Sequence, residues 1–224
     1  MTVLDRMAVV IPARDEAAAI AGVVRELEAE GARTVIVVDN GSRDGTADSA
    51  RAAGARVVAA PTPGYGWACR AGMRAVGSCD AIGFIDGDGS FAARDLARLA
   101  VRVLGGGADL ALGIRDTSTL APHQRAGNAL ALALLHGLYG LALPDVAPLR
   151  VVNAAFAATL GMGGSRYGWP MEMLARAARR GARIATLSVG YGPRRGGASK
   201  VSGSLRSSVL AGADFVHALA SCRL

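Results

Sequence analysis

Lysine is nearly absent from this chain of 224 residues, because Lys200 is the single lysine among 25 basic residues. Cysteine is also scarce, and Cys69, Cys79 and Cys222 lack the spacing of a zinc site or a redox pair. We therefore expect free thiols and a reducing compartment. Aromatic residues make up 4% of the chain and do not alternate with the basic residues, which argues against nucleic-acid binding.

Long hydrophobic runs are missing as well. The longest, residues 129–143, is interrupted by His136 and two glycines and is shorter than the stretch of about 20 residues that spans a bilayer. The first residues, with Asp5 and Arg6 ahead of a short apolar run, do not form a signal peptide. We expect a cytoplasmic protein, for which a peripheral place at the cytoplasmic membrane face stays open.

The remaining composition is that of a globular protein, with 51% hydrophobic and 19% charged residues. The net charge of +7 is unevenly distributed along the chain. Residues 1–149 carry 14 Arg and 16 acidic residues, whereas residues 150–224 carry 11 basic residues and two acidic ones. A basic C-terminal third favours a phosphorylated or otherwise anionic partner, although a charged, solvated surface explains it equally well.

Short apolar runs rich in β-branched residues alternate with segments of helical period, which is typical of a mostly parallel, Rossmann-like α/β sheet flanked by helices. We predict strands at residues 7–11, 35–38, 56–59, 81–85, 110–113 and 183–189, and an extended segment at 150–156. Helices are predicted at residues 16–30, 44–53, 66–76, 96–104, 124–139, 169–180 and 204–220. The length predicts a single domain over residues 1–224.

Polar residues follow several predicted strands, at the sheet edge where ligands bind in open parallel sheets. They lie at residues 12–16, 39–42 and 86–88 and at Arg115. Asp86 and Asp88 repel each other unless a cation lies between them, and Mg²⁺ or Mn²⁺ prefers such oxygen ligands. A plain Asp-Gly turn that binds nothing is the simpler alternative.

Two further interpretations compete for this acidic pair. A calcium-binding EF-hand loop fails because its sixth position, Phe91, would have to be glycine. A phosphatase of the haloacid dehalogenase type matches locally, with Asp86 as nucleophile and Asp88 as general acid, but it needs a later lysine followed by an acidic cluster. Only Asp214 follows Lys200, and the N-terminal third would stay unexplained.

Three motifs together resemble the family 2 glycosyltransferases of GT-A fold. They are Ile11-Pro12-Ala13-Arg14-Asp15-Glu16, Val37-Val38-Asp39-Asn40-Gly41-Ser42-Arg43-Asp44-Gly45-Thr46 and Asp86-Gly87-Asp88, each after a predicted strand. The resemblance implies that residues 1–115 bind a nucleoside diphosphate sugar through Pro12, Ala13, Arg14, Glu16, Asp39, Gly66, Asp86 and Asp88. It also implies that Asp86 and Asp88 hold the Mg²⁺ or Mn²⁺ that neutralises the departing diphosphate. The family usually has a second aspartate in place of Asn40, to which we assign no role.

The C-terminal part narrows the resemblance to the branch of dolichyl-phosphate and polyprenyl-phosphate sugar transferases. The likeness lies in residues 145–150, 167–172 and 191–200. By motif match, the donor and acceptor phosphates would be bound by Arg150, Arg194, Ser199 and Lys200, to which we add Arg115 at a strand end. Glu172 is expected on the acceptor side, as a general base or as a residue that orients an arginine; a structural Glu–Arg pair is the alternative.

The resulting prediction is an inverting, metal-dependent glycosyltransferase that moves a sugar to a polyprenyl phosphate at the membrane surface. Its catalytic residues would be Asp88, Glu172, Arg194 and Lys200. Residues 116–224 would form the acceptor-binding half, with apolar residues at 130–143 and 210–219 as candidates to lie against the lipid. A glycosyltransferase acting on a soluble sugar or phosphorylated metabolite is the first alternative, and the phosphatase is the second.

Overall fold

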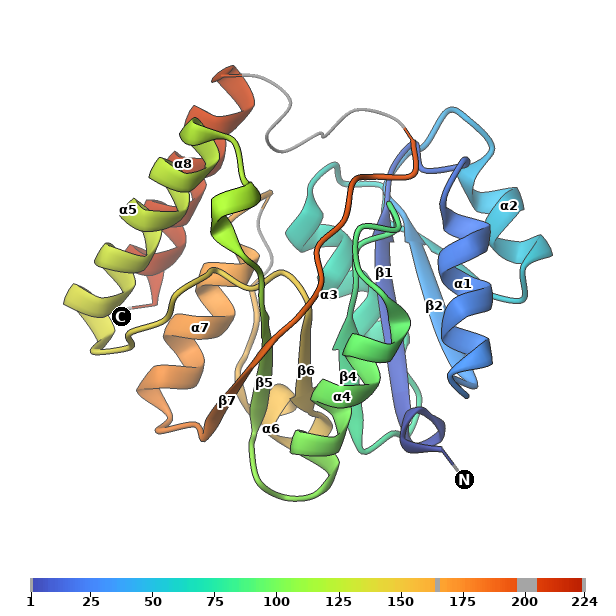
Figure 1. Ribbon diagram of the computed structural model, residues 1–224, viewed down its shortest axis with the longest axis horizontal. Helices are drawn as coiled ribbons and strands as arrows, with labels where there is room; N and C mark the ends of the chain where they lie inside the picture. The colour runs from blue at the N-terminus through green and yellow to red at the C-terminus, as the bar shows by residue number, and fades with distance from the viewer. Residues whose placement is uncertain (1, 164–165, 197–204, 223–224) are drawn as a thin grey trace.

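A single sheet organises the chain. The structure is a computed structural model and describes residues 2–163, 166–196 and 205–222. Seven strands lie in the order β3-β2-β1-β4-β6-β5-β7, with helices on both faces (Figure 1). All strand pairs are parallel except the two that β6 makes, with β4 and with β5. The predicted mostly parallel, Rossmann-like α/β architecture is confirmed.

The elements follow the predicted order with bounds shifted by a few residues. The strands are β1 (Met7–Ala13), β2 (Thr34–Asp39), β3 (Arg56–Ala59), β4 (Ala81–Phe84), β5 (Leu110–Ile114), β6 (Arg150–Asn153) and β7 (Ile184–Ser188). The helices are α1 (Ile20–Ala29), α2 (Thr46–Ala52), α3 (Tyr65–Ala75), α4 (Ala93–Leu104), α5 (Pro122–Tyr139), α6 (Ala154–Thr159), α7 (Trp169–Arg179) and α8 (Leu205–Ser221), with short 3-10 helices at Val3–Arg6 and Thr117–Thr119.

One prediction of secondary structure was wrong. The chain is not extended as far as Phe156, because β6 ends at Asn153 and helix α6 begins at the next residue. The Asn153 Oδ1 accepts a hydrogen bond from the backbone N–H of Phe156 at 2.9 Å. Asparagine is a strong residue at this helix-capping position, so a local side-chain bond overrides the extended pattern of the preceding residues.

The helices enclose a buried core on each face of the sheet. On the face covered by α1 and α4, Val9 of β1 and Leu27 belong to one buried cluster. On the opposite face, Val10 belongs to a second cluster with Cys69 of α3 and Trp169 of α7. Neighbouring residues of β1 thus enter different cores, as expected for a strand that is covered on both sides.

The order of the strands reverses beside β1, which lies between β2 and β4. Ligands bind beyond the carboxyl ends of the strands at such a reversal. The pairing of β1 with β4 ends at Val10 and Phe84, whereas β1 continues beside β2 as far as Ala13. Pro12, which has no N–H to donate, lies past the last pair between β1 and β4. The two strands therefore part where the polar motifs begin.

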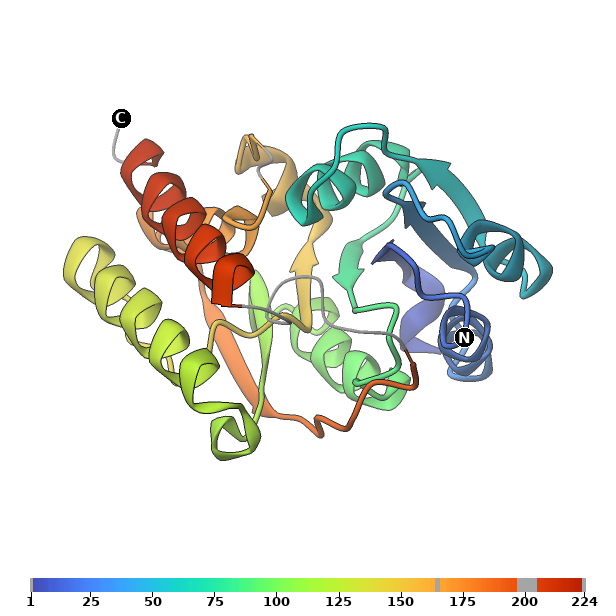
Figure 2. The same ribbon diagram turned by 90° about the horizontal axis from the view of Figure 1, so that it is seen from above.

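The second half of the chain adds a pair of helices beside the sheet. Helices α5 and α8 lie side by side in both views (Figures 1 and 2), and the Tyr139 hydroxyl donates to the carbonyl oxygen of Leu219. Leu135 and Leu219 are buried between the elements, whereas Leu130 and Val216 are 60% and 50% exposed. Within the described ranges, no helix is long and apolar enough to cross a membrane. The division into a donor half and an acceptor half stays a prediction.

Candidate active site

A cleft of about 580 Å³ opens at the carboxyl ends of β1, β2 and β4. On the sheet side it is lined by Pro12, Ala13, Arg14, Glu16, Asn40, Asp86, Gly87 and Asp88. Facing residues of the second half are Arg115, His123, Gln124, Asn128, Arg166, Tyr167, Tyr191 and Arg194. The structure therefore brings together, from the residues singled out in the sequence, Pro12, Ala13, Arg14, Glu16, Asp86, Asp88, Arg115 and Arg194.

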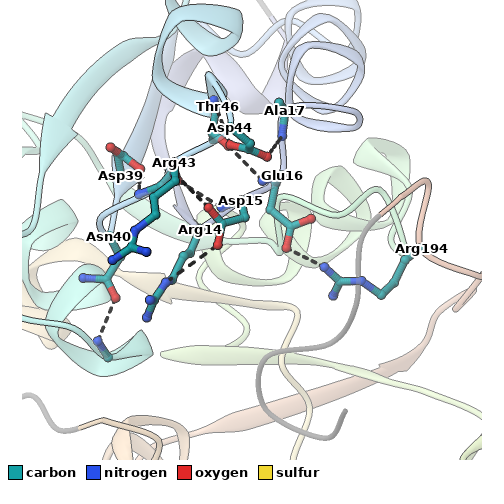
Figure 3. A network of polar contacts seen from close by, with 12 residues as sticks. Arg14, Asp15, Glu16, Ala17, Asp39, Asn40, Arg43, Asp44, Thr46 and Arg194 are labelled. Atoms are coloured by element: carbon teal, nitrogen blue, oxygen red, sulfur yellow. Dashed lines mark hydrogen bonds and ion pairs between the residues drawn. The ribbon is translucent and has the colours of Figure 1, made fainter.

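The turn after β1 is tied to the start of α2 by side chains of the second motif (Figure 3). The backbone N–H of Glu16 donates to Thr46 Oγ1 at 2.8 Å, and that of Ala17 donates to Asp44 Oδ2 at 3.0 Å. Burial alone would raise the pKa of Asp44, but hydrogen bonds from Thr46 and from the Ala17 backbone hold that pKa below its ordinary value. These bonds fix Glu16 at the edge of the cleft.

Asp39 ends β2 but is not among the residues that line the described cleft. Its Oδ1 accepts the backbone N–H of Ser42 at 3.1 Å, and Ser42 Oγ accepts the N–H of Asp15 at 3.0 Å. Asp15 has a φ of 50°, a left-handed conformation that aspartate adopts more readily than most residues. Asp39 thus shapes the joined turns, and its contact with a nucleoside stays a prediction.

The guanidinium of Arg194 bridges two buried carboxylates near the carboxyl end of β4. Arg194 Nη1 lies 2.7 Å from Asp88 Oδ2, and Arg194 Nη2 lies 2.5 Å from Glu16 Oε1 (Figure 3 shows the second contact). Asp88 is 5% exposed, and its Oδ1 accepts hydrogen bonds from the backbone N–H and the hydroxyl of Ser90 at 2.9 and 2.6 Å. The charge of Arg194 therefore offsets the repulsion between Glu16 and Asp88.

Asp86 lies beside this bridge and faces the cleft. Within the described residues, no hydrogen bond or ion pair reaches its carboxylate. Burial and the nearby charge of Asp88 raise the pKa of Asp86 to about 7, against the opposing effect of Arg115 and Arg194. A divalent cation would relieve this crowding of negative charge.

The donor set fits Mg²⁺ or Mn²⁺. Asp86 and Asp88 offer two carboxylates, and no group of three or more His, Cys, Asp or Glu suited to a metal occurs among the residues that the structure describes. Magnesium is commonly held by one or two carboxylates, with water and substrate phosphates completing its shell. A cation here would depend on oxygen atoms from its ligand as well as from the protein.

The wall opposite the acidic residues is built around Arg115, whose side chain is 13% exposed. Its Nε and Nη2 donate to the two oxygens of the fully buried Asp145 at 2.9 and 2.8 Å, and its guanidinium lies 5.1 Å from the centre of the Tyr191 ring. This two-pronged contact orients the guanidinium toward a fixed point in the cleft. Ser199 and Lys200, which are also predicted to bind phosphates, lie outside the described residues.

Arg150 lies beneath the cleft rather than in its lining. Its side chain is fully buried, and its guanidinium donates to the carbonyl oxygens of Val146, Ala147 and Pro170 at 2.9, 2.6 and 3.2 Å. The guanidinium also lies 5.8 Å from the centre of the Trp169 ring. Burial lowers the pKa of Arg150 from its ordinary value. In this arrangement Arg150 supports the floor of the site, and its contact with a phosphate stays a prediction.

Glu172 and Gly66 are also absent from the lining of the described cleft. Glu172 is 6% exposed, and its Oε1 accepts hydrogen bonds from Arg176 Nε at 2.9 Å and from the Gly163 N–H at 2.7 Å. As a general base it would need a path to the acceptor that the described cleft does not provide. The backbone N–H of Gly66 donates to the carbonyl oxygen of Arg166 at 3.1 Å, so this donor is already used.

Three residues that shape the cleft have no role that the sequence predicted: Asn40, Asp145 and Tyr191. Asn40 was visible only as a departure from the usual aspartate of the second motif. Asp145 and Tyr191 stand in segments that carry the resemblance, but the partner of each lies far away in the chain. No rule of spacing along the sequence identifies such partners.

The family model of Glycosyl transferase family 2 matches residues 8–144. This chain is a family 2 glycosyltransferase. An uncharacterized glycosyltransferase of Mycobacterium tuberculosis is 42% identical over 215 residues, which cover 94% of this chain and 96% of that protein. The glycosyltransferase AglJ of Haloferax volcanii is 27% identical, over 86% of this chain and 65% of its own. Membership of the family decides against the phosphatase alternative.

The fold of this glycosyltransferase is shared with solved structures. Glucosyl-3-phosphoglycerate synthase from Mycobacterium tuberculosis, in complex with Mn²⁺, UDP and glucosyl-3-phosphoglycerate, has a TM-score of 0.80 at 23% identity, covering 96% of this chain and 79% of that one. The same synthase with Mg²⁺ and UDP has a TM-score of 0.75 at 22% identity, covering 96% and 78%. The predicted GT-A fold is thereby confirmed.

Proposed function

We propose that this glycosyltransferase moves a hexosyl group, with inversion, from a nucleoside diphosphate sugar to a soluble phosphorylated acceptor, with Mg²⁺ or Mn²⁺ held by Asp86 and Asp88. One observation carries the proposal. Three parallel strands end at one cleft, where an acidic cluster faces the cationic groups of Arg115 and Arg194. A donor diphosphate with its cation and a negatively charged acceptor are what such a division of charge accommodates.

The sheet side of the cleft suits the donor. Pro12 and Ala13 offer an apolar surface, and the carboxylate of Glu16 can accept hydrogen bonds from the N–H groups of a base or from ribose hydroxyls. When bound, the cation would neutralise the charge that develops on the departing diphosphate. The Arg194 guanidinium matches phosphate oxygens with two parallel donors, so it can leave the carboxylates for the diphosphate once the cation binds.

The opposite wall suits an anionic acceptor. Arg115, oriented by Asp145, and Arg166 present cationic groups to the cleft, and His123 and Asn128 add polar ones. Holding an acceptor oxygen in line with the donor sugar lowers the barrier by fixing orientation. A phosphate oxygen is already anionic, whereas a hydroxyl acceptor would give its proton to a basic group that lines the cleft or to the departing diphosphate. Other solved structures of the same synthase contain phosphoglyceric acid, which supports a soluble phosphorylated acceptor here too.

A polyprenyl phosphate acceptor is the second candidate, and a surface feature favours it. Leu130 and Val216 are 60% and 50% exposed on α5 and α8, the helices that also contribute His123 and Phe215 to the cleft. A lipid chain leaving the cleft could lie on such side chains, while its phosphate used the cationic wall. The two candidate acceptors therefore share an anionic phosphate, and only the polyprenyl phosphate adds an apolar chain.

The first experiment tests the donor site by calorimetric titration of UDP and of GDP, each with and without Mn²⁺. We expect one nucleotide to bind in the presence of Mn²⁺ and binding to be lost in Asp88→Asn. Asp48→Asn is the matched control, because Asp48 is an exposed carboxylate on α2 that does not line the cleft. It pairs with Arg51 at a distance of 2.8 Å. Absence of nucleotide binding by the unaltered chain would overturn the proposal.

The second experiment tests the acceptor with the nucleotide sugar that binds. Transfer is measured to phosphoglyceric acid in buffer and to a short polyprenyl phosphate in detergent. Transfer to the soluble acid without detergent supports the proposal. Transfer to the lipid alone would replace it with the second candidate, and absence of transfer to either acceptor would overturn both.

A further inference from the structure

The side-chain carboxamide of Asn40 makes all its hydrogen bonds to one loop. Its Nδ2 donates to the carbonyl oxygens of Ala60 and Thr62 at 2.9 and 2.8 Å, and its Oδ1 accepts the backbone N–H of Gly64 at 2.7 Å. The residue is 6% exposed and lies directly after Asp39, as Figure 3 shows. Asn40 therefore ties the end of β2 to residues 60–64, which lead into α3.

The loop that Asn40 holds forms part of the cleft. Pro63 and Gly64 line it on the sheet side, next to Asn40 itself. Gly64 has a φ of 144°, and a Cβ at this residue would lie 2.8 Å from the Cα of Arg166 on the opposite wall. The loop thus takes a conformation that needs glycine and makes a close approach between the two walls. A small shift of residues 60–64 would change the shape of the donor side.

An aspartate at this position could not hold the loop in the same way. A carboxylate has no hydrogen to donate, so the carbonyl oxygens of Ala60 and Thr62 would lose their partner and face a negative charge instead. Leaving the buried carbonyl oxygen of Ala60 without its partner is costly, and the loop would move to bring this oxygen to water. The asparagine is therefore matched to this loop conformation, whereas the isosteric acid is not.

We propose that Asn40 is a positioning residue for the donor nucleotide. Its carboxamide holds residues 60–64 in the conformation that completes the nucleoside side of the cleft, and the residue acts through this loop rather than on the reacting atoms. The proposal rests on the proposed donor, a nucleoside diphosphate sugar. It assigns a binding role to the position at which the second motif departs from its usual form.

The test compares Asn40→Asp and Asn40→Ala with a matched control, Asn153→Asp. Asn40→Ala removes all three bonds, including the one from the Gly64 N–H that a carboxylate can still accept, and adds no charge; it serves if Asn40→Asp fails to fold. At Asn153 the side-chain oxygen only accepts a bond, from the Phe156 N–H, and a carboxylate performs this capping role equally well. Asn153 is paired with Ala81, at the end of the β4–β6 pair that lies away from the cleft.

Two measurements separate the role of Asn40 from that of the site as a whole. Hydrogen exchange of residues 60–66, followed without nucleotide, reports whether the loop is held. Titration with UDP or GDP and Mn²⁺, together with kcat and KM for the nucleotide sugar, reports whether the loop matters to the donor. We expect faster exchange and about a tenfold weaker nucleotide affinity in both Asn40 variants, with a raised donor KM and a nearly unchanged kcat.

Each outcome has a distinct meaning. Unchanged exchange in the Asn40 variants would overturn the role in holding the loop. Faster exchange with unchanged nucleotide affinity and donor KM would reduce Asn40 to a structural residue and overturn its role in positioning. A change of the same size in Asn153→Asp would do the same. Failure of the unaltered chain to bind either nucleotide would overturn the proposed function itself, and with it the donor role of Asn40.

Discussion

Replacing Arg194 by alanine should destabilise the protein without a cation and much less with one. In the structure the guanidinium pairs with Asp88 at 2.7 Å and with Glu16 at 2.5 Å, and together with Arg115 it offsets the charge of the acidic cluster that includes Asp86. Arg194→Ala leaves three acids at one cleft with less to offset them. Mn²⁺ bound at Asp86 and Asp88 would supply the missing positive charge.

The size of the effect follows from the burial of the partners. Removing one member of a buried ion pair costs about 3 to 5 kcal/mol. The Arg194 side chain is 24% exposed, while those of Glu16 and Asp88 are 9% and 6% exposed, so solvent reduces the effect and about 2 kcal/mol is expected. For a domain of this size, 2 kcal/mol corresponds to a Tm lower by about 4 to 8 °C.

The assay is chemical denaturation with and without saturating Mn²⁺, and without nucleotide. Because the penalty shrinks when the cation binds, linkage requires that Arg194→Ala bind Mn²⁺ more tightly than the unaltered chain, by about tenfold for each 1.4 kcal/mol regained. The control is Arg98→Ala. Arg98 pairs with the buried Asp95 at 2.8 Å but does not line the described cleft, so Mn²⁺ should leave its penalty unchanged.

An equal loss of stability for Arg194→Ala with and without Mn²⁺ would refute the reasoning, because it would mean that the cation does not take the place of Arg194 at Asp88. Weaker binding of Mn²⁺ by the variant would refute it more strongly, since Arg194 would then assist the cation instead of competing with it. A rescue of the same size in Arg98→Ala would point to general ion binding.

Three further predictions concern other parts of the fold. Asp145→Asn should raise the acceptor KM about tenfold with little change in nucleotide affinity, because Asp145 orients Arg115; steady-state kinetics and titration check this. Under native conditions iodoacetamide should label Cys79 and spare Cys69 and Cys222, because these two are 0% and 3% exposed whereas Cys79 is only partly buried. Burial raises the pKa of all three thiols, so access of the reagent decides the labelling, and mass spectrometry before and after denaturation counts the labels. Trp169→Phe should lower the free energy of unfolding by less than about 1.5 kcal/mol, because the buried Nε1 has no hydrogen-bond partner among the described residues. Trp169→Ala should lower it by about 4 kcal/mol, because the buried ring supplies the packing; urea denaturation measures both.

The sheet could be predicted from the sequence because its strands are short apolar runs whose signal is local. Val35 to Val38, for example, is buried on both sides and ends at a polar motif. Helix α1 begins at Ile20, later than Glu16, after a turn in which the Glu16 carbonyl oxygen accepts the N–H groups of Ala19 and Ile20 and the Glu16 N–H donates to Thr46 Oγ1. That bond joins two motifs that the sequence presents separately, and no local pattern predicts it.

The site was predicted in part, and for a physical reason. The strand ends determine which side chains reach the cleft, so Glu16, Asp86 and Asp88 could be chosen from position alone. Basic residues of the second half could not be sorted in this way. Arg150 and Arg194 stand in similar motifs, yet one is buried against carbonyl oxygens and the other reaches two carboxylates, because their surroundings come from tertiary packing.

The bridge made by Arg194 also bears on the order in which ligands bind. Without a cation, the guanidinium is held by Glu16 and Asp88 and is not available to a diphosphate. A cation at Asp88 releases it, and the donor diphosphate then gains both the cation and the arginine as partners. Binding of cation and nucleotide should therefore be cooperative, and by reciprocity each should strengthen the other by the same factor. In Arg194→Ala that factor should fall even though Mn²⁺ alone binds more tightly, because the arginine that couples the two ligands is gone.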